Sequence, residues 1–270
     1  MKKILLILNE SHLPQQVIQT AVNIANKSKS ILEAVFLNDI NALNYGYPFP
    51  NDLFLTEKSR GESAAAEGTK LLNDMAKVFR DTCDGLGVEY RIDTEKAVTI
   101  KHLIMLSQFS DVMIADPQAE SDDYSLKEIL ADAHCPLLLV PKKAVPAEKI
   151  YLVYDGSFSS MHAIKMFSYI FPEYTNLPAQ FFHIGGPDMD GISHVNEIKV
   201  WASKHFSKLS FELIPANTKK ELVAYMKKES EKAVLVLGAY SGSSIARLFL
   251  KNMAELIIGE TSATIFITHK

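Results

Sequence analysis

The chain has 270 residues, of which 47% are hydrophobic and 22% are charged, and its formal net charge is −4 at pH 7. This is the composition of an ordinary globular protein, and the length suits one large domain or two domains of ordinary size. An acidic balance with scattered lysines and arginines argues against nucleic-acid binding, which usually needs a basic excess or stripe.

Short apolar runs alternate with helical patterns through the first half of the chain. The runs Ile4–Leu8 and Ile31–Leu37 predict strands buried on both faces, as in a parallel sheet, and Pro14 opens a helix between them. Further strands are expected at Val88–Ile92, Val112–Ala115 and Pro136–Val140. Apolar positions predict the intervening helices at Leu71, Leu72, Met75, Val78 and Phe79 and at Ile100, Leu103, Ile104 and Leu106, and a capping box at Ser125–Glu128 begins a short one.

The opening of the chain then repeats after a linker-like stretch, residues 141–149. Lys149–Ser157 aligns with Lys3–Ser11, and the same alternation follows. Helices are predicted at Ala163, Met166, Phe167 and Ile170, at Val195, Ile198, Ala202 and Phe206, and from Thr218, and strands at Ala179–Ile184, Leu209–Ile214, Val234–Leu237 and Ile265–Thr268.

Each half therefore reads as five strands alternating with four helices. This pattern predicts two tandem α/β, Rossmann-like domains, residues 1–145 and 146–270, each a five-stranded parallel sheet with helices on both faces. Ligands of such sheets lie beyond the carboxyl ends of the strands, where the strand order reverses. In each half that point lies where the ends of the first and fourth strands meet.

The most informative stretch runs from Val234 to Glu255. A strand ends at Gly238, a loop of small residues follows to Ser244, and a helical pattern comes next. Small residues let backbone N–H groups approach a phosphate, and a helix start favours negative charge. The alternative is that the loop is small only because the chain turns sharply there.

With these residues the chain resembles the universal stress protein family (UspA-like), as a tandem of two such domains. The resemblance rests on Asp155, Gly156 and Ser157, with Ser160 and Ala163 behind them, and on the Gly238 loop with Asn252 and Glu255. It implies a flavodoxin-like sheet of order 3-2-1-4-5 in each half. Members that bind nucleotide carry an aspartate after the first strand and a loop G-x2-G-x9-G-[S/T] after the fourth.

The second half departs from that loop in part. Gly238 matches the first glycine, whereas the second falls on Ser241, with Gly242 one position late. The third falls on Lys251, and the Ser/Thr position on Asn252. Asn252 and Glu255 form a pair like a capping box, which satisfies a helix start without any ligand.

The first half departs further. Asn9, Glu10 and Ser11 stand in place of Asp-Gly-Ser. Residues 116–123 hold no glycine, lose one N–H at Pro117, and place four acids where a phosphate would lie. We predict that this half binds no nucleotide.

The other polar residues match no metal-binding or catalytic motif. His183, Asp188, Asp190 and His194 follow no metal-ligand spacing, and we interpret them as a polar turn. No P-loop, nucleophile elbow or H-E-x-x-H motif occurs. The aromatic loop 45–50 is a partner surface, a lid, or a segment packed over its own half.

The two cysteines and the apolar runs bear on location. Cys83 and Cys135 lack metal-binding spacing, so we expect reduced, partly buried thiols. The apolar run at the start is too short for a signal peptide, and no run reaches 18 apolar residues. We expect a cytoplasmic protein that spans no membrane.

Two functions remain open. In the first, the second domain alone binds ATP or a related adenine nucleotide, and the family implies a stress-response or regulatory role. In the second, both pockets are degenerate, and the halves form an internal pseudo-dimer that presents surfaces to partners or to further copies. No catalytic set is visible, so we do not expect an enzyme. The residues predicted to bind nucleotide are Asp155, Gly156, Ser157, Gly238, Ser241, Gly242, Ser243 and Asn252.

Overall fold

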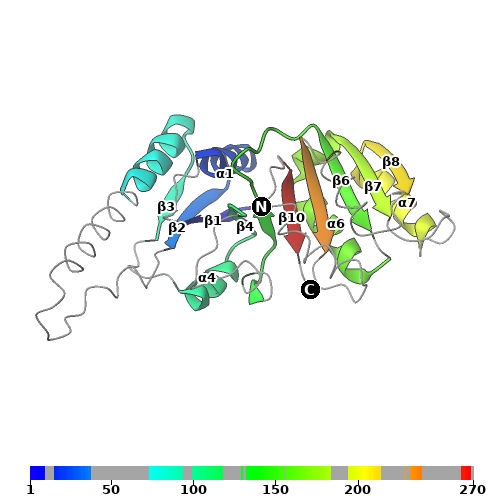
Figure 1. Cartoon of the computed structure of the whole chain (residues 1–270), viewed down its shortest axis with the longest axis horizontal. Coiled ribbons are helices and arrows are strands. Elements are labelled where there is room, and N and C mark those ends of the chain that lie inside the picture. The colour runs from blue at the N-terminus through cyan, green and yellow to red at the C-terminus, as the bar shows by residue number, and fades with distance from the viewer. Residues whose placement is uncertain are drawn as a thin grey trace, which may run out of the picture. The chain divides into compact units, whose positions relative to one another are not determined.

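The computed structural model describes every predicted strand, at least in part, and most of the predicted helices. The residues described are 1–9, 15–37, 73–93, 99–117, 129, 132–154, 156–183, 194–213, 228, 232–238 and 263–268. Backbone contacts divide the chain into two compact units, which we call the amino-terminal unit (Lys2–His134) and the carboxy-terminal unit (Cys135–Lys270, together with Met1). Each unit is described by itself below (Figure 1).

The amino-terminal unit is built on four parallel strands in the order β3-β2-β1-β4. Residues 73–86 are also helical. The central strand is apolar on both faces, and its residues from Ile4 to Leu8 are at most 1% exposed. The labelled elements of the amino-terminal unit are β1 (Lys3–Asn9), α1 (Gln15–Ser28), β2 (Ile31–Leu37), β3 (Tyr90–Ile92), α4 (Ile100–Ser107) and β4 (Val112–Ala115).

The carboxy-terminal unit has strand order β5-β10-β9-β6-β7-β8. Read from β8, this is the order 3-2-1-4-5 that the family resemblance implies, with β5 added beyond β10. Its elements are β5 (Leu137–Leu139), β6 (Lys149–Tyr154), α6 (Phe158–Ile170), the 3₁₀ helix η1 (Pro172–Asn176), β7 (Pro178–His183), α7 (Val195–His205), β8 (Lys208–Leu213), β9 (Ala233–Gly238) and β10 (Thr264–Thr268).

Aromatic side chains pack α6 against the sheet of the carboxy-terminal unit. The ring of Phe167 lies 5.4 Å from that of Phe266 on β10 and 5.5 Å from that of Phe171, measured between centroids. All three side chains are at most 1% exposed. Buried aromatic pairs of this geometry add about 0.5–1.5 kcal/mol beyond the area they bury. They hold α6, and with it the candidate site at its start, against β9 and β10.

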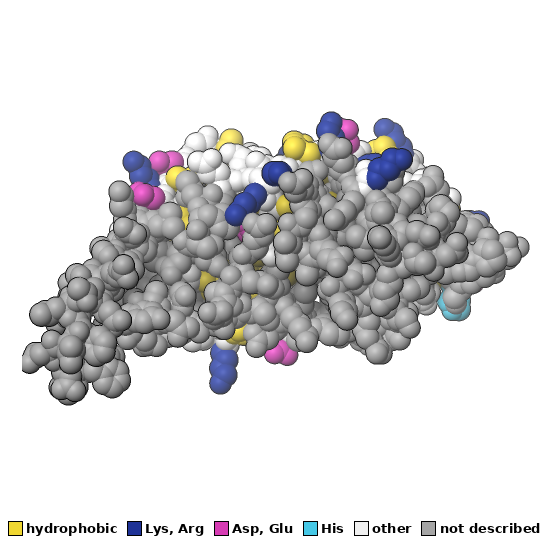
Figure 2. All heavy atoms as spheres, in the orientation of Figure 1, with side chains coloured by type: hydrophobic (Ala, Val, Ile, Leu, Met, Phe, Trp, Pro, Cys, Tyr) yellow, Lys and Arg dark blue, Asp and Glu magenta, His cyan; other side chains and the backbone are white. Residues whose placement is uncertain are grey.

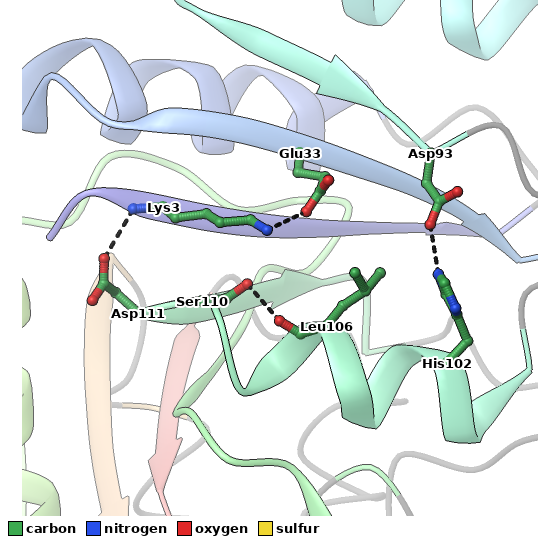
Figure 3. A network of polar contacts seen from close by, with 7 residues as sticks. All are labelled: Lys3, Glu33, Asp93, His102, Leu106, Ser110 and Asp111. Carbon is green, nitrogen blue, oxygen red and sulfur yellow. Dashed lines mark hydrogen bonds and ion pairs between the residues drawn. The ribbon is translucent and has the colours of Figure 1, made fainter.

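Polar contacts tie the amino-terminal ends of the two central strands in each unit. The backbone N–H of Lys3 donates to the Asp111 carboxylate at 2.9 Å, which joins the start of β1 to the start of β4 (Figure 3). At the corresponding place in the other unit, Lys232 Nζ lies 2.8 Å from Glu148 Oε1, and Glu148 N donates to Lys232 O at 2.8 Å. Both units therefore tie these strand starts, one through a backbone donor to a carboxylate and the other through an ion pair and a backbone hydrogen bond.

The predicted α/β class and the parallel order of these strands are confirmed. Observed strand ends agree with the predicted ones to within two residues, and Ile31–Leu37 and Val112–Ala115 agree fully. One pairing differs from the prediction of purely parallel sheets, because β5 pairs antiparallel with β10. A short apolar run such as residues 136–140 carries no signal for the direction of its partner, so the sequence could not reveal this.

Several predictions stay outside the part of the chain that is described. They are the helices that begin near Ser125, Thr218 and Ser244, and the aromatic loop 45–50. Backbone contacts divide the chain between His134 and Cys135. The predicted boundary at residue 145 was drawn from the sequence repeat instead, and it stays a prediction. None of the helices in the described ranges has the length and apolarity needed to cross a bilayer.

Candidate functional site

The candidate site lies at the carboxyl ends of β6 and β9. These two strands are parallel neighbours, with Leu152 in register with Val236, and β6 pairs with β7 on its other side. The chain leaves β6 toward β7 on one side, while β9 lies on the other, so the strand order reverses here. This is the position at which the sequence predicted that the first and fourth strands of a half would meet, and α/β sheets bind ligands at such points.

The turn from β6 into α6 is set by two of the predicted site residues. Gly156 has φ of +81°, a left-handed conformation that favours glycine. Ser157 is the N-cap of α6, where its Oγ accepts a hydrogen bond from Ser160 N at 3.1 Å. The Ser160 hydroxyl in turn donates to the Ser157 carbonyl at 2.9 Å. The start of α6 is thus fixed by its own side chains.

Gly238 brings the end of β9 against this first turn of α6. A Cβ atom at position 238 would lie 2.5 Å from the carbonyl carbon and oxygen of Ser159 and 2.6 Å from Ser160 N. Real Cβ atoms do not approach backbone so closely, so only glycine fits without displacement. The first glycine of the predicted phosphate loop therefore lies directly beside the helix start.

Three of the eight predicted residues are thus gathered at one place. Gly156, Ser157 and Gly238 surround the first turn of α6, whereas the remaining five fall outside the described residues: Asp155, Ser241, Gly242, Ser243 and Asn252. Ser159, whose backbone forms the wall that Gly238 contacts, was not among the predicted residues. Its signal in the sequence was only indirect, since a glycine at the end of a buried strand marks a close approach of backbone.

The arrangement suits an anion but does not require one. Backbone N–H groups of the first helical turn have no partner within a helix and carry partial positive charge. However, one of them, Ser160 N, is already satisfied by Ser157. The packing against Ser159 is also a sufficient reason for a glycine at position 238.

The outer side of this helix start carries an aromatic pair. Phe158 is 67% exposed, and its ring stacks on that of His162, with 6.2 Å between centroids and 13° between planes. Behind the helix, Tyr154 at the end of β6 is buried, and its ring lies edge-on to Phe181 at 6.5 Å. The site thus has a buried base and an exposed aromatic flank.

The corresponding place in the amino-terminal unit is built differently. Asn9 ends β1 where the other unit has Asp155, and Asp116 follows β4 where the other has glycine. Asp116 is only 2% exposed. Near the carboxyl end of β3, Asp93 Oδ2 lies 2.7 Å from His102 Nε2 of α4, a pair that sequence reasoning missed (Figure 3).

The predicted polar turn is described only at its two ends. His183 ends β7, and His194, with φ of +58°, precedes α7. Asp188 and Asp190 lie outside the described residues, so the interpretation as a polar turn stays a prediction. Among the residues that are described, no group of three or more histidine, cysteine, aspartate or glutamate side chains is placed to hold a metal ion.

Comparison with known structures supports the fold. No protein-family model matches the sequence, and no curated protein matches it either. A universal stress protein from Archaeoglobus fulgidus aligns with 99% of this chain and 96% of its own, with a TM-score of 0.67 and 11% identity. The universal stress protein UspA from Lactobacillus plantarum covers 50% of this chain and 94% of its own, with a TM-score of 0.34 and 14% identity.

The first of these likenesses spans nearly the whole chain. It shows that this chain has the fold of a universal stress protein, as its residues suggested. At 11% identity the likeness concerns the fold alone, and it assigns no ligand and no role.

Proposed function

We propose that the carboxy-terminal unit binds ATP or a related adenine nucleotide between β6 and β9, and that the protein serves in stress response or regulation. It acts as a binding module rather than an enzyme, because no nucleophile, base and orienting group can be assembled from its sequence. The buried thiol of Cys83, which forms no disulfide, supports the accompanying proposal of a cytoplasmic location.

The observation that carries the proposal is the contact between Gly238 and the first turn of α6. It places the start of the 238–244 loop beside a helix start, and that is where α/β folds collect the N–H groups that hold phosphates. Asp155 follows β6 directly in the sequence. In this proposal the backbone of residues 238–243 and Asn252 holds the phosphates, and Asp155 holds the nucleoside.

A second function has its own support. The N-cap of α6 is satisfied by Ser157 and the close packing explains Gly238, so neither feature needs a ligand. Phe158 and Tyr169 on α6 are 67% and 54% exposed. In this alternative the pocket holds no nucleotide and the protein presents surfaces to a partner or to a second copy.

Nucleotide release and thermal stability distinguish the two functions. The purified protein is denatured, and the supernatant is examined for nucleotide by mass spectrometry. ATP is then titrated in a thermal melt of the intact protein, in which a concentration of about 100 times Kd stabilises a binding unit by about 2.7 kcal/mol. We expect released adenine nucleotide or a melting temperature that rises with ATP.

Matched variants locate the effect. Asp155→Ala should abolish the ATP-dependent rise, whereas Glu148→Gln should keep it, because Glu148 is an exposed residue at the opposite end of β6. No released nucleotide and an unchanged melt at millimolar ATP would support the alternative function. Turnover of ATP by the purified protein would contradict the assignment as a binding module.

A further inference from the structure

The carboxy-terminal unit has a hollow at the opposite edge of its sheet from the candidate site. Its volume is about 390 Å³, and it lies where β6, β7 and β8 begin. Pockets for small ligands usually measure about 300–1,000 Å³. The hollow is lined by the first residues of these strands, which include Lys149, Pro178, Gln180, Lys208, Leu209 and Ser210.

The register of the strands brings the polar side chains of this hollow to one face. Pro178 pairs with Lys208, and Gln180 pairs with Ser210 on one side and with Tyr151 on the other. Alternate residues of a strand share a face, so Lys208 and Ser210 lie on the same face, as do Lys149 and Tyr151. The two lysines therefore flank an amide and a hydroxyl.

The charge of the lining has a single sign. It contains two ammonium groups, one amide and one hydroxyl, and no carboxylate. The Lys149 ammonium lies 4.9 Å from the ring centroid of Tyr151, which is a cation–π distance. Figure 2 shows several basic side chains at the upper right, with an acidic side chain beside one of them. A local positive site on a chain of net charge −4 is a feature that composition does not predict.

The remaining lining is apolar. Pro178 pairs with Lys208 and adds an apolar side chain to the face that carries the polar groups, whereas Ala179 and Leu209 alternate to the other face of the sheet. A site with an apolar side chain beside a few donors fits a ligand with an apolar body and an anionic head. Two ammonium groups match a head with two negative charges, which a phosphate monoester carries above its second pKa of about 6.

We propose that this hollow binds a phosphate monoester with a small apolar body, in which Lys149, Gln180, Lys208 and Ser210 hold the phosphate and Pro178 contacts the body. The site is distinct from the proposed nucleotide site, since the two lie at opposite ends of β6. It requires no contribution from the loop after Gly238.

Phenyl phosphate is the probe for this site, with inorganic phosphate and phenol as its two halves. Binding to the full chain is measured by ligand-detected NMR titration at low ionic strength and pH 8. We expect saturable binding of phenyl phosphate with a Kd at least about tenfold lower than that of either half, a difference of about 1.4 kcal/mol. The affinity should fall on addition of NaCl, because the lysines are partly exposed.

Three variants decide the location. Lys208→Gln should weaken phenyl phosphate binding about fivefold, the effect of removing one exposed charge contact. Lys204→Gln is the matched control, an exposed lysine on α7 that lies outside the lining, and it should leave the Kd unchanged. Ser157→Ala at the other edge should also leave it unchanged.

Other results would overturn the inference. One is the absence of saturable binding of phenyl phosphate. A second is an equal loss of affinity for phenyl phosphate in Lys208→Gln and Lys204→Gln. A third is a loss of affinity in Ser157→Ala with no loss in Lys208→Gln. The last result would place the anion at the carboxyl edge instead. Because Lys208 is exposed, its replacement should leave the thermal melt of the unliganded protein unchanged, which the same samples check.

Discussion

At the scale of single residues, Gly238 shows how one position serves packing and a candidate site together. Its lack of a side chain lets β9 touch the backbone of Ser159 and Ser160. Sequence reasoning treated this glycine as part of a phosphate loop or a sharp turn. The geometry adds a third reason, because the close approach of a strand to a helix start would exclude any larger residue.

We therefore predict that Gly238→Ala destabilises the protein by about 1–3 kcal/mol, the usual cost of forcing an extra carbon into close-packed structure. Urea unfolding measures the change. Gly85→Ala is the matched control, since a Cβ atom there meets nothing within 4 Å and the residue is helical. That variant should be neutral or more stable by up to about 1 kcal/mol. Equal behaviour of the two variants would mean that the close contact at Gly238 is absent.

Cys83 couples stability to alkaline pH. Burial, and secondly the charge of Asp84, raises the pKa of its thiol from an ordinary value of 9.0 to about 12. The unfolded chain therefore loses this proton at lower pH than the folded chain does. As a result, the free energy of unfolding should fall as the pH rises from about 9 toward 12. Tyr174 acts in the same direction, because burial and then the Glu173 charge raise the pKa of its phenol.

Urea unfolding at pH 8 and at pH 10.5 measures this fall in the protein and in Cys83→Ala. The variant lacks the thiol, so its stability should decline less over the same interval, and the difference isolates the contribution of Cys83 from that of other groups. A decline of equal size in both proteins would contradict the raised pKa.

At the scale of elements, the most consequential feature is the strand that the sequence repeat and the backbone contacts assign differently. β5 belongs to the first half by repeat, yet it pairs with β10 through Leu137, Leu138 and Leu139. These leucines are at most 4% exposed, and their partners Ile265, Phe266 and Ile267 at most 2%. Without β5, the hydrogen-bonding edge of β10 would be open.

Two fragments test which assignment matters for folding. A chain of residues 135–270 keeps β5, and a chain of residues 146–270 lacks it. We expect the longer fragment to be more stable by about 2–4 kcal/mol in urea, from the apolar area that β5 buries. The shorter should self-associate on size-exclusion chromatography, because an exposed apolar edge strand pairs with other chains. Equal stability and equal size would favour the boundary near residue 145.

At the scale of the whole molecule, the two units share a fold and differ at the carboxyl edges of their sheets. Both tie the amino-terminal ends of their central strands, one through Lys3 and Asp111 and the other through Glu148 and Lys232. At the carboxyl edge, the amino-terminal unit has the buried Asp116 where the other has Gly238. The nucleotide titration belongs to this scale, because our proposal has only the carboxy-terminal unit respond to ATP.

The amino-acid sequence by itself determined the α/β class and nearly all of the described strands, and it predicted a tandem repeat. Local apolar runs and helical periodicity carry that information, and the fully buried central strand Ile4–Leu8 leaves little ambiguity. The sequence also placed Gly156, Ser157 and Gly238 at one edge, because the carboxyl ends of neighbouring parallel strands meet there.

Only the tertiary structure decided which strands and side chains contact one another. The antiparallel partner of β5, the contact of Gly238 with Ser159 and the hollow beside Lys208 all depend on residues distant in sequence. Such contacts arise from strand order and from the approach of one backbone to another. Periodicity along a single chain records which face of an element is buried, but not which distant residue covers it.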